Sequence, residues 1–192
     1  MITGDFEKAV KALRAGEAVV FPTDTVYGVG VSVMHAGSPD TIYALKKRDA
    51  GKPIAWLVDG AQALDRYGVD VPETARALAQ AHWPGALTII VKASDAVPRA
   101  FRSEAGTVGL RMPADEVALG LVRAVGPIAA SSANVSGGSD AGDAAELDPA
   151  LTEQVCTLVA DGASAASGVS STVVDCSSGS VRVLRQGDVQ VV

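Results

Sequence analysis

The stretch that decides the fold is FPTDTVYGVG, residues 21–30. The apolar run before it, 18–21, is short and rich in β-forming residues, so it predicts a buried strand. Pro22 cannot donate to a sheet ladder and ends that strand. Two threonine hydroxyls, a carboxylate and a phenol follow where α/β proteins commonly bind ligands. Taken alone, the stretch favours a simpler interpretation as a turn that connects two elements; three later stretches reverse that preference.

Outward from this stretch, short apolar runs alternate with segments of helical period. The runs predict strands at 54–58, 87–91, 107–111, 127–130, 156–160, 172–175 and 181–184. The periodic segments predict helices at 5–16, 38–48, 59–67, 72–82 and 115–125, with a weaker one after 148. Residues 22–37 are expected to be a polar loop, 93–106 a loop, and 139–148 a mobile segment. This alternation predicts one domain over 1–192, an α/β fold with an open sheet of mixed strand direction.

Composition narrows the class of protein. The 192 residues carry a formal net charge of −6, which argues against a surface that coats nucleic acid. Cys156 and Cys176 are the only cysteines, and neither has neighbours that suggest a metal site. We find neither a signal peptide nor an apolar run long enough to span a membrane, so we expect a cytoplasmic protein.

A basic cluster closes the second predicted helix. Lys46, Arg48 and Lys52 fall within seven residues, and a phosphate chain is bound by several cations of this kind. Cations at the C-terminal end of a helix also interact favourably with its dipole, which is the simpler interpretation of the cluster. If they do bind phosphate, we expect Lys46 and Arg48 to be accessible, so that replacing either costs activity far more than stability.

A second polar segment, 131–138, contains three serines, Asn134 and two glycines directly after a predicted strand. Hydroxyls and amides there suit phosphate or adenine edges, and glycines let backbone N–H groups approach an anion. A flexible turn is the alternative for glycine and serine alone. Arg111, at the exit of another strand, is either a clamp for a small carboxylate or part of a structural ion pair.

The sequence contains no Ser-His-Asp set, no Walker loop and no GxGxxG. Any catalysis would therefore depend on holding charged reactants together and stabilising phosphate charge, without a protein nucleophile.

Six stretches, 21–30, 46–53, 83–91, 107–113, 131–138 and 171–175, together resemble the YrdC-type family of threonylcarbamoyl-AMP synthases. They occur in the family's order over nearly the whole chain. The resemblance implies a twisted open α/β sheet with flanking helices around a large concave pocket. It also implies a reaction that joins L-threonine, bicarbonate and ATP into threonylcarbamoyl-AMP with release of pyrophosphate. Mg²⁺ would accompany the ATP, and downstream proteins would transfer the threonylcarbamoyl group to tRNA.

The resemblance also implies roles for individual residues, with no protein metal ligand among them. The catalytic positions would be Lys46, Arg48, Ser132 and Asn134. The ATP contacts would be Arg48, Lys52, Thr107, Ser132, Asp140 and Arg185. The threonine contacts would be Thr25, Arg111, Ala130 (through its backbone) and Ser171.

Three positions depart from the family pattern. Lys52 stands where many members have asparagine, and Leu57 stands where many have a substrate-contacting histidine. Asp140 replaces a neutral residue at a nucleotide contact, so we expect it either to point away from the phosphates or to act through Mg²⁺. The chain ends soon after Arg185, as in the short form of the family that lacks an extra C-terminal domain.

Two other functions remain open on the sequence. One is a carbamoyltransferase-type domain that forms a carbamoyl-adenylate from carbamoyl phosphate. The other is an RNA-binding or ribosome-associated protein that uses the same concave face, which the acidic net charge disfavours.

Overall fold

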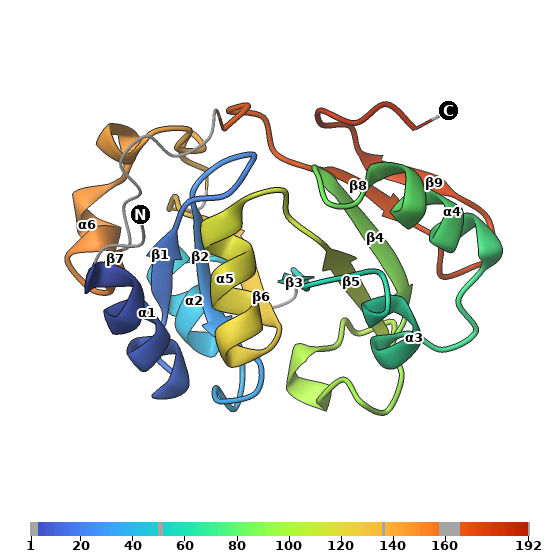
Figure 1. Ribbon diagram of the computed structural model, residues 1–192, viewed down its shortest axis with the longest axis horizontal. Coiled ribbons are helices and arrows are strands. Elements are labelled where there is room, and N and C mark those ends of the chain that lie inside the picture. The colour runs from blue at the N-terminus through green and yellow to red at the C-terminus, as the bar shows by residue number, and fades with distance from the viewer. Residues whose placement is uncertain (1–3, 50–51, 136, 158–165, 192) are drawn as a thin grey trace.

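One mixed sheet runs through the computed structural model, which describes residues 4–49, 52–135, 137–157 and 166–191 (Figure 1). Its strands are β1 (Val19–Phe21), β2 (Gly28–Ser32), β3 (Ala55–Leu57), β4 (Leu87–Lys92), β5 (Thr107–Arg111), β6 (Ile128–Ser132), β7 (Cys156–Thr157), β8 (Thr172–Asp175) and β9 (Arg182–Arg185). Their order is β7-β1-β2-β6-β3-β5-β4-β8-β9. The pairs β7–β1, β3–β5 and β4–β8 are parallel and the other pairs are antiparallel. The predicted α/β fold with an open sheet of mixed direction is confirmed.

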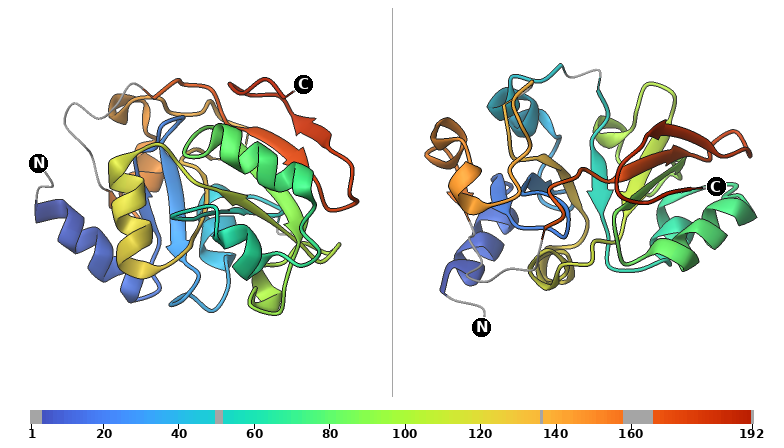
Figure 2. Two further views of the ribbon diagram at one scale, coloured as in Figure 1. Left: turned by 45° about the vertical axis from the view of Figure 1, so that its right-hand side comes forward. Right: turned by 90° about the horizontal axis from the view of Figure 1, so that it is seen from above.

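Helices flank this sheet on both sides (Figure 2). They are α1 (Gly4–Arg14), α2 (Asp40–Lys46), α3 (Ala63–Tyr67), α4 (Glu73–His82), α5 (Glu116–Val125) and α6 (Pro149–Thr152). Two 3₁₀ turns, η1 (Arg99–Phe101) and η2 (Ala144–Glu146), lie in the connections. In Figure 2, α1, α5, α3 and α4 lie on one side of the sheet and α2 lies on the other. Within the described residues, no helix is long and apolar enough to cross a membrane.

Local sequence explains why α5 forms where it was predicted. The Asp115 carboxylate accepts a hydrogen bond from the Ala118 N–H at 2.8 Å, which satisfies one of the unpaired donors of the first turn. Gly126 follows the last turn at a φ of 80°, a conformation that glycine adopts without a steric penalty. The apolar stripe of α5 packs with α1 over Val19, Phe21 and Ile128 of the sheet.

The predicted polar loop at 22–37 was wrong in part, because β2 occupies Gly28–Ser32 between β1 and β6. Of the two glycines that suggested a turn, Gly30 instead permits close packing. A Cβ added at Gly30 would lie 2.6 Å from the Ile128 methyl group and 2.9 Å from the Ala129 carbonyl oxygen. Glycine at this position of β2 therefore marks a close approach of the neighbouring strand β6.

Other helices and strands begin or end a few residues away from their predicted boundaries. The helix predicted at 59–67 is confined to α3, and the last strand begins one residue later than expected. The predicted strand 156–160 begins as β7, while 158–160 lie outside the described residues. The segment 139–148, expected to be mobile, contains η2, which the Asp143 and Glu146 side chains cap.

Candidate active site

A cavity of about 300 Å³ opens on one face of the sheet. The alternation along β4 places it: Thr88 and Ile90 line the cavity, whereas Leu87 and Ile89 are buried in the core that α3 and α4 help to form. Successive side chains of a strand point to opposite faces. The cavity therefore lies on the face of β4 that is turned away from α4.

Most of the predicted site residues meet in this cavity. Its wall includes Thr25, Arg48, Thr107, Arg111, Ala130, Ser132, Ser171 and Arg185. These residues come from the three strands β5, β6 and β9, from the residue before β8 and from the loops after β1 and α2, so the sheet topology brings together positions far apart in the sequence. Lys46, Lys52, Asn134 and Asp140 are not among the described residues that line it.

Lys46 lies behind the wall and is almost completely buried, with 2% of its surface exposed. Its ammonium group donates to the backbone carbonyls of Ser132 and Asn134 and to the Asn134 side-chain oxygen, the last at 2.8 Å. Ser132 Oγ donates to the same amide oxygen at 2.7 Å, and the Asn134 amide nitrogen donates to the Gly138 carbonyl at 2.6 Å. The expectation that Lys46 is an accessible charge was wrong, because its ammonium ties α2 to the loop after β6.

The electrostatics around Lys46 favour anion binding nearby. Burial and the positive charge of Arg48 lower the pKa of Lys46 to about 8, while the Asp140 carboxylate opposes that change. Burial also lowers the pKa of Arg185, helped by Arg111 and Arg48 and opposed by Asp140. Arg48 and Asp140 thus act on both Lys46 and Arg185, and Arg111 acts on Arg185 as well. Asp140 itself accepts a hydrogen bond from Ser170 Oγ at 2.5 Å.

Arg48 and Lys52 differ although they belong to one sequence cluster. Arg48 is half-buried and lines the cavity, and its Nη2 donates to the Pro53 carbonyl at 3.2 Å. Arg48 Nε is buried without a hydrogen-bond partner in the described part of the protein. Lys52 is exposed, and its carbonyl accepts from the Tyr43 hydroxyl at 3.2 Å. Whether Lys52 contacts ATP stays a prediction.

Another part of the cavity wall is organised around Arg111. Its guanidinium donates to Asp24 Oδ1 at 2.7 Å, to Thr25 Oγ1 at 3.0 Å and to the Gly85 carbonyl at 3.0 Å. The two interpretations of Arg111 therefore do not exclude each other, because the arginine forms an ion pair and also lines the cavity.

A chain of hydroxyl groups crosses from this part of the wall toward β9. Thr88 Oγ1 and Ser171 Oγ lie 2.9 Å apart, and Arg185 donates to Ser171 through Nε and Nη2. Leu57 forms part of the apolar wall and is almost fully buried.

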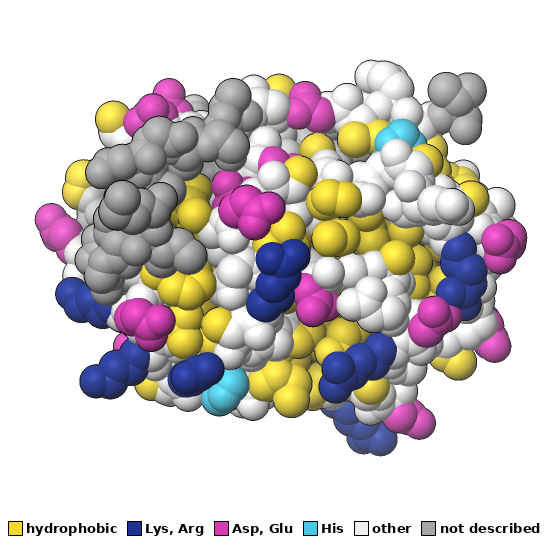
Figure 3. Space-filling model, viewed as in Figure 1, with side chains coloured by type: hydrophobic (Ala, Val, Ile, Leu, Met, Phe, Trp, Pro, Cys, Tyr) yellow, Lys and Arg dark blue, Asp and Glu magenta, His cyan; other side chains and the backbone are white. Residues whose placement is uncertain are grey.

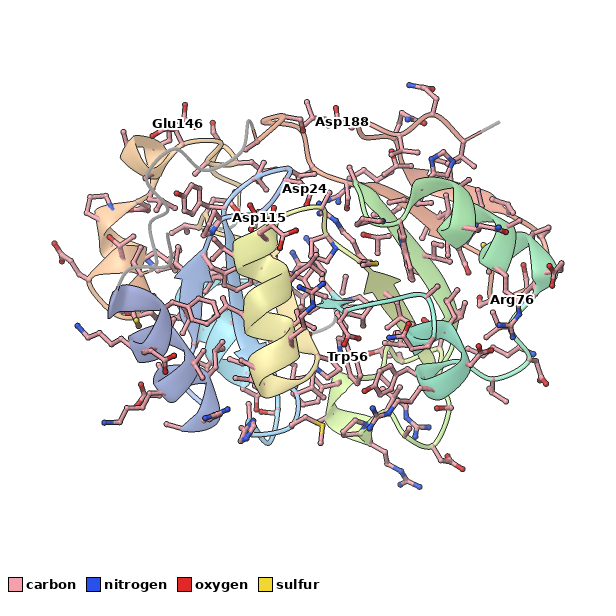
Figure 4. All side chains as sticks on the ribbon, viewed as in Figure 1. Asp24, Trp56, Arg76, Asp115, Glu146 and Asp188 are labelled. Carbon is pink, nitrogen blue, oxygen red and sulfur yellow. The ribbon has the colours of Figure 1, made fainter. Side chains whose placement is uncertain are left out.

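Sequence reasoning assigned no role to Asp24 or Thr88. Asp24 lies in the stretch 21–30, on the loop after β1 (Figure 4), and a carboxylate between two threonines was an available signal. Thr88 is a polar residue inside an apolar strand, which indicates a strand with one face turned toward a polar site.

The arrangement can hold two anionic groups side by side. Arg48 and Arg185 offer charge to a phosphate chain, and Arg111 offers it to a carboxylate. On the face drawn in Figure 3, basic and acidic side chains are interspersed without a broad basic surface.

Comparison with known proteins gives one consistent family. The Sua5/YciO/YrdC family model, described as "Telomere recombination", matches residues 11–187. A Mycobacterium tuberculosis protein is 38% identical over 181 residues, covering 94% of this chain and 83% of its own. A Bacillus subtilis protein named threonylcarbamoyl-AMP synthase is 37% identical over 185 residues, covering 95% of this chain and 53% of its own.

A solved structure has the same fold. The crystal structure of Pyrococcus abyssi Sua5 in complex with L-threonine superposes with a TM-score of 0.84 at 34% identity. The match covers 95% of this chain and 54% of the Pyrococcus protein. The chain thus spans about half the length of the Bacillus and Pyrococcus relatives.

Proposed function

Because this chain belongs to the Sua5/YciO/YrdC family, we propose that it is a threonylcarbamoyl-AMP synthase, which joins L-threonine, bicarbonate and ATP and releases pyrophosphate. The observation that carries the proposal is that Arg48, Arg111 and Arg185 line one cavity together with hydroxyl groups such as that of Thr25. A polyanionic nucleotide and an amino acid carboxylate are the pair of ligands that this arrangement suits.

In this reaction the threonine amine and bicarbonate form a carbamate with loss of water. The carbamate oxygen then attacks the α-phosphorus of ATP, and pyrophosphate leaves. The carbamate is short-lived in water, so a cavity that places it against the α-phosphate raises its effective concentration and limits hydrolysis. Arg48 and Arg185 would offset the charge on the departing phosphates.

Within this proposal Lys46, Ser132 and Asn134 act as one unit. The three N–H donors of Lys46 are engaged by oxygens of Ser132, at the end of β6, and of Asn134 in the loop after it, so its contribution to ATP is its positive charge and the shape of that loop. Ser132 lines the cavity and is the member of the unit with direct access to a nucleotide.

Mg²⁺ is proposed to enter with ATP. Among the described residues, no group of three or more His, Cys, Asp or Glu side chains could hold a metal ion. That composition fits Mg²⁺ carried by phosphates and water with at most one or two carboxylates. Asp140, which acts electrostatically on Lys46 and Arg185, is the carboxylate we assign to it. When bound, Mg²⁺ would neutralise phosphate charge.

We further propose that the reaction takes place in the cytoplasm and that its product is consumed there. The consumers would be proteins that transfer the threonylcarbamoyl group to tRNA, with no direct tRNA contact required of this chain.

The test is pyrophosphate release by purified protein supplied with L-threonine, Mg·ATP and carbon-labelled bicarbonate, with the label followed into a threonylcarbamoyl-AMP product by mass spectrometry. Release should require all three substrates. A protein that releases no pyrophosphate above background refutes the proposal.

Two substitutions in the assay separate the alternatives. Activity with carbamoyl phosphate in place of bicarbonate and threonine would indicate the carbamoyltransferase-type domain. Tight, salt-sensitive binding to duplex RNA without ATP would indicate an RNA-binding protein.

A further inference from the structure

Arg111 is held by three separate segments. Its Nε donates to the carbonyl of Gly85 before β4, and its Nη1 donates to Thr25 Oγ1 after β1. Nη2 forms an ion pair of 2.7 Å with Asp24, and the two side chains are only 8% and 14% exposed. A charge-assisted contact with so little exposure is stronger than a surface pair.

These contacts leave Arg111 able to bind a second group. A guanidinium has five N–H donors, and the three bonds use one on each nitrogen. One donor therefore remains on each terminal nitrogen. Arg111 lines the cavity, whereas Asp24 is not among the described lining residues. Asp24 consequently acts on the arginine from outside the cavity and does not occupy the ligand's place.

The hydroxyl of Thr25 is oriented by a similar arrangement. Thr23 Oγ1 donates its one hydrogen to the Val26 carbonyl at 2.7 Å. Thr23 Oγ1 also accepts from the backbone N–H groups of Thr25 and Val26 at 3.2 and 3.3 Å. In the 3.1 Å contact between the two threonine hydroxyls, only Thr25 still has a hydrogen to donate. Thr25 Oγ1 also accepts from Arg111, so its remaining capacity is one lone pair. Toward the cavity, Thr25 can only accept a hydrogen bond.

From these contacts we infer that Asp24 and Thr23 are positioning residues that set the polarity of the amino acid site. Asp24 fixes Arg111 so that its remaining donors take the carboxylate of the substrate. Thr23 fixes Thr25 as an acceptor for the ammonium or hydroxyl group at the other end. The inference rests on the proposed function only for the identity of the amino acid as threonine.

The backbone carbonyls of Asp24 and Thr25 are also held by hydrogen bonds. Ser167 N–H donates to the Asp24 carbonyl and Gly168 N–H donates to the Thr25 carbonyl. The loop is thus anchored through its main chain, and replacing the Asp24 side chain need not displace it.

The experiment compares Asp24→Asn with the wild type by calorimetric titration of threonine and, separately, of ATP. Asparagine keeps the size and an acceptor but removes the charge. We expect the threonine Kd to rise at least about tenfold, as loss of a charge-assisted hydrogen bond predicts, while the ATP Kd stays within about twofold. Equal threonine binding by both proteins would overturn the inference.

The second pair of variants tests Thr23. Thr23→Val keeps the shape and removes the hydroxyl, so Thr25 loses its hydrogen-bond acceptor and can turn its own hydrogen toward the substrate. Thr23→Ser retains the hydroxyl and should restore threonine binding. Asp65→Asn is the control for loss of a carboxylate charge, because Asp65 forms an ion pair with Arg76 at the surface. The exposed fraction of the side chain is 63% for Asp65 and 40% for Arg76. A threonine Kd that rises in the control as much as in Asp24→Asn would count against the inference.

Binding and turnover are read separately so that the two proposals can fail separately. If the wild type binds threonine more tightly than Asp24→Asn but forms no adenylate, the proposed function is refuted and the positioning role of Asp24 is kept. A wild type that forms the adenylate while Asp24→Asn leaves threonine binding and its KM unchanged refutes the positioning role alone.

Discussion

Lys46 and Arg111 are two buried cations of the site whose hydrogen-bond donors are used differently. Lys46 has three N–H donors and three oxygen partners, all from residues 132–134. Arg111 has five donors and three partners, so it keeps two for a ligand. Both cations interact with residues more than 80 positions away in the sequence.

The difference separates a residue that supports the structure of the site, Lys46, from one that can bind a ligand, Arg111. A lysine whose donors are all engaged can influence ATP only through its charge and through the loop that it holds. An arginine with remaining donors can bind a carboxylate directly. A residue that sequence comparison places in a catalytic set can therefore act without touching the substrate.

The largest effect is expected for Lys46→Met, which keeps the length of the side chain and removes its charge and donors. Three oxygens would lose their partner, which should cost about 1–3 kcal/mol of stability. Displacement of the loop after β6 should lower kcat/KM for ATP at least about 100-fold. Thermal unfolding and steady-state kinetics measure the two effects.

Lys47→Asn is the matched control, since Lys47 is exposed and its φ of 49° is one that asparagine tolerates. If Lys46→Met kept wild-type stability while losing activity, Lys46 would be a direct ATP contact and the comparison with Arg111 would fail.

Arg48→Ala should separate activity from stability, in contrast to Lys46→Met. Arg48 is half-buried and donates one hydrogen bond to a backbone carbonyl, so unfolding free energy should change by no more than about 0.5 kcal/mol. Loss of a cation at the cavity wall should lower kcat/KM for ATP by about 10- to 100-fold. Arg123→Ala, on the exposed side of α5, provides the control. A stability loss as large as that of Lys46→Met would assign Arg48 to the architecture as well.

The pH dependence should report the charge of Lys46. Because its pKa is lowered from 10.5 to about 8, kcat/KM for ATP should fall with a midpoint near that value as the ammonium loses its proton. Asp140 raises this pKa, so Asp140→Asn should move the midpoint to lower pH. If the midpoint of this fall in kcat/KM were unchanged in Asp140→Asn, Lys46 would not be the group whose titration is observed.

Unfolding does not explain such a loss of activity. Between pH 8 and pH 10.5 the unfolded chain still binds the Lys46 proton and the folded chain does not. For this group, stability therefore rises with pH across that window. Thermal unfolding at each pH distinguishes the two causes.

Patterns within short windows predicted most of the fold. The apolar runs predicted β4, β5 and β8, and the apolar stripe within 115–125 predicted α5. β2 was missed because glycine in a strand that packs closely on its neighbours has the same local signal as glycine in a turn.

The site was predictable as a set of residues and not as a network. Eight of the predicted positions line one cavity, but the burial of Lys46 depends on oxygens at 132–134, far along the chain. The Asp24–Arg111 ion pair likewise joins residues 87 positions apart. No local pattern specifies which polar groups meet across a folded sheet, so the partners of each cation required coordinates.

The smallest effect is expected for Lys52→Ala, which tests the boundary of the site. Lys52 shares a sequence cluster with Arg48, yet its side chain is exposed and is not among the described lining residues. An exposed charge is screened by salt, so we expect the KM for ATP to rise by no more than about threefold and stability to stay unchanged. The measurement is the KM for ATP at low and at high ionic strength. A rise above about tenfold that persists at high salt would mean that Lys52 contacts the nucleotide when ATP is bound, and the basic end of the site would then extend beyond the cavity seen here.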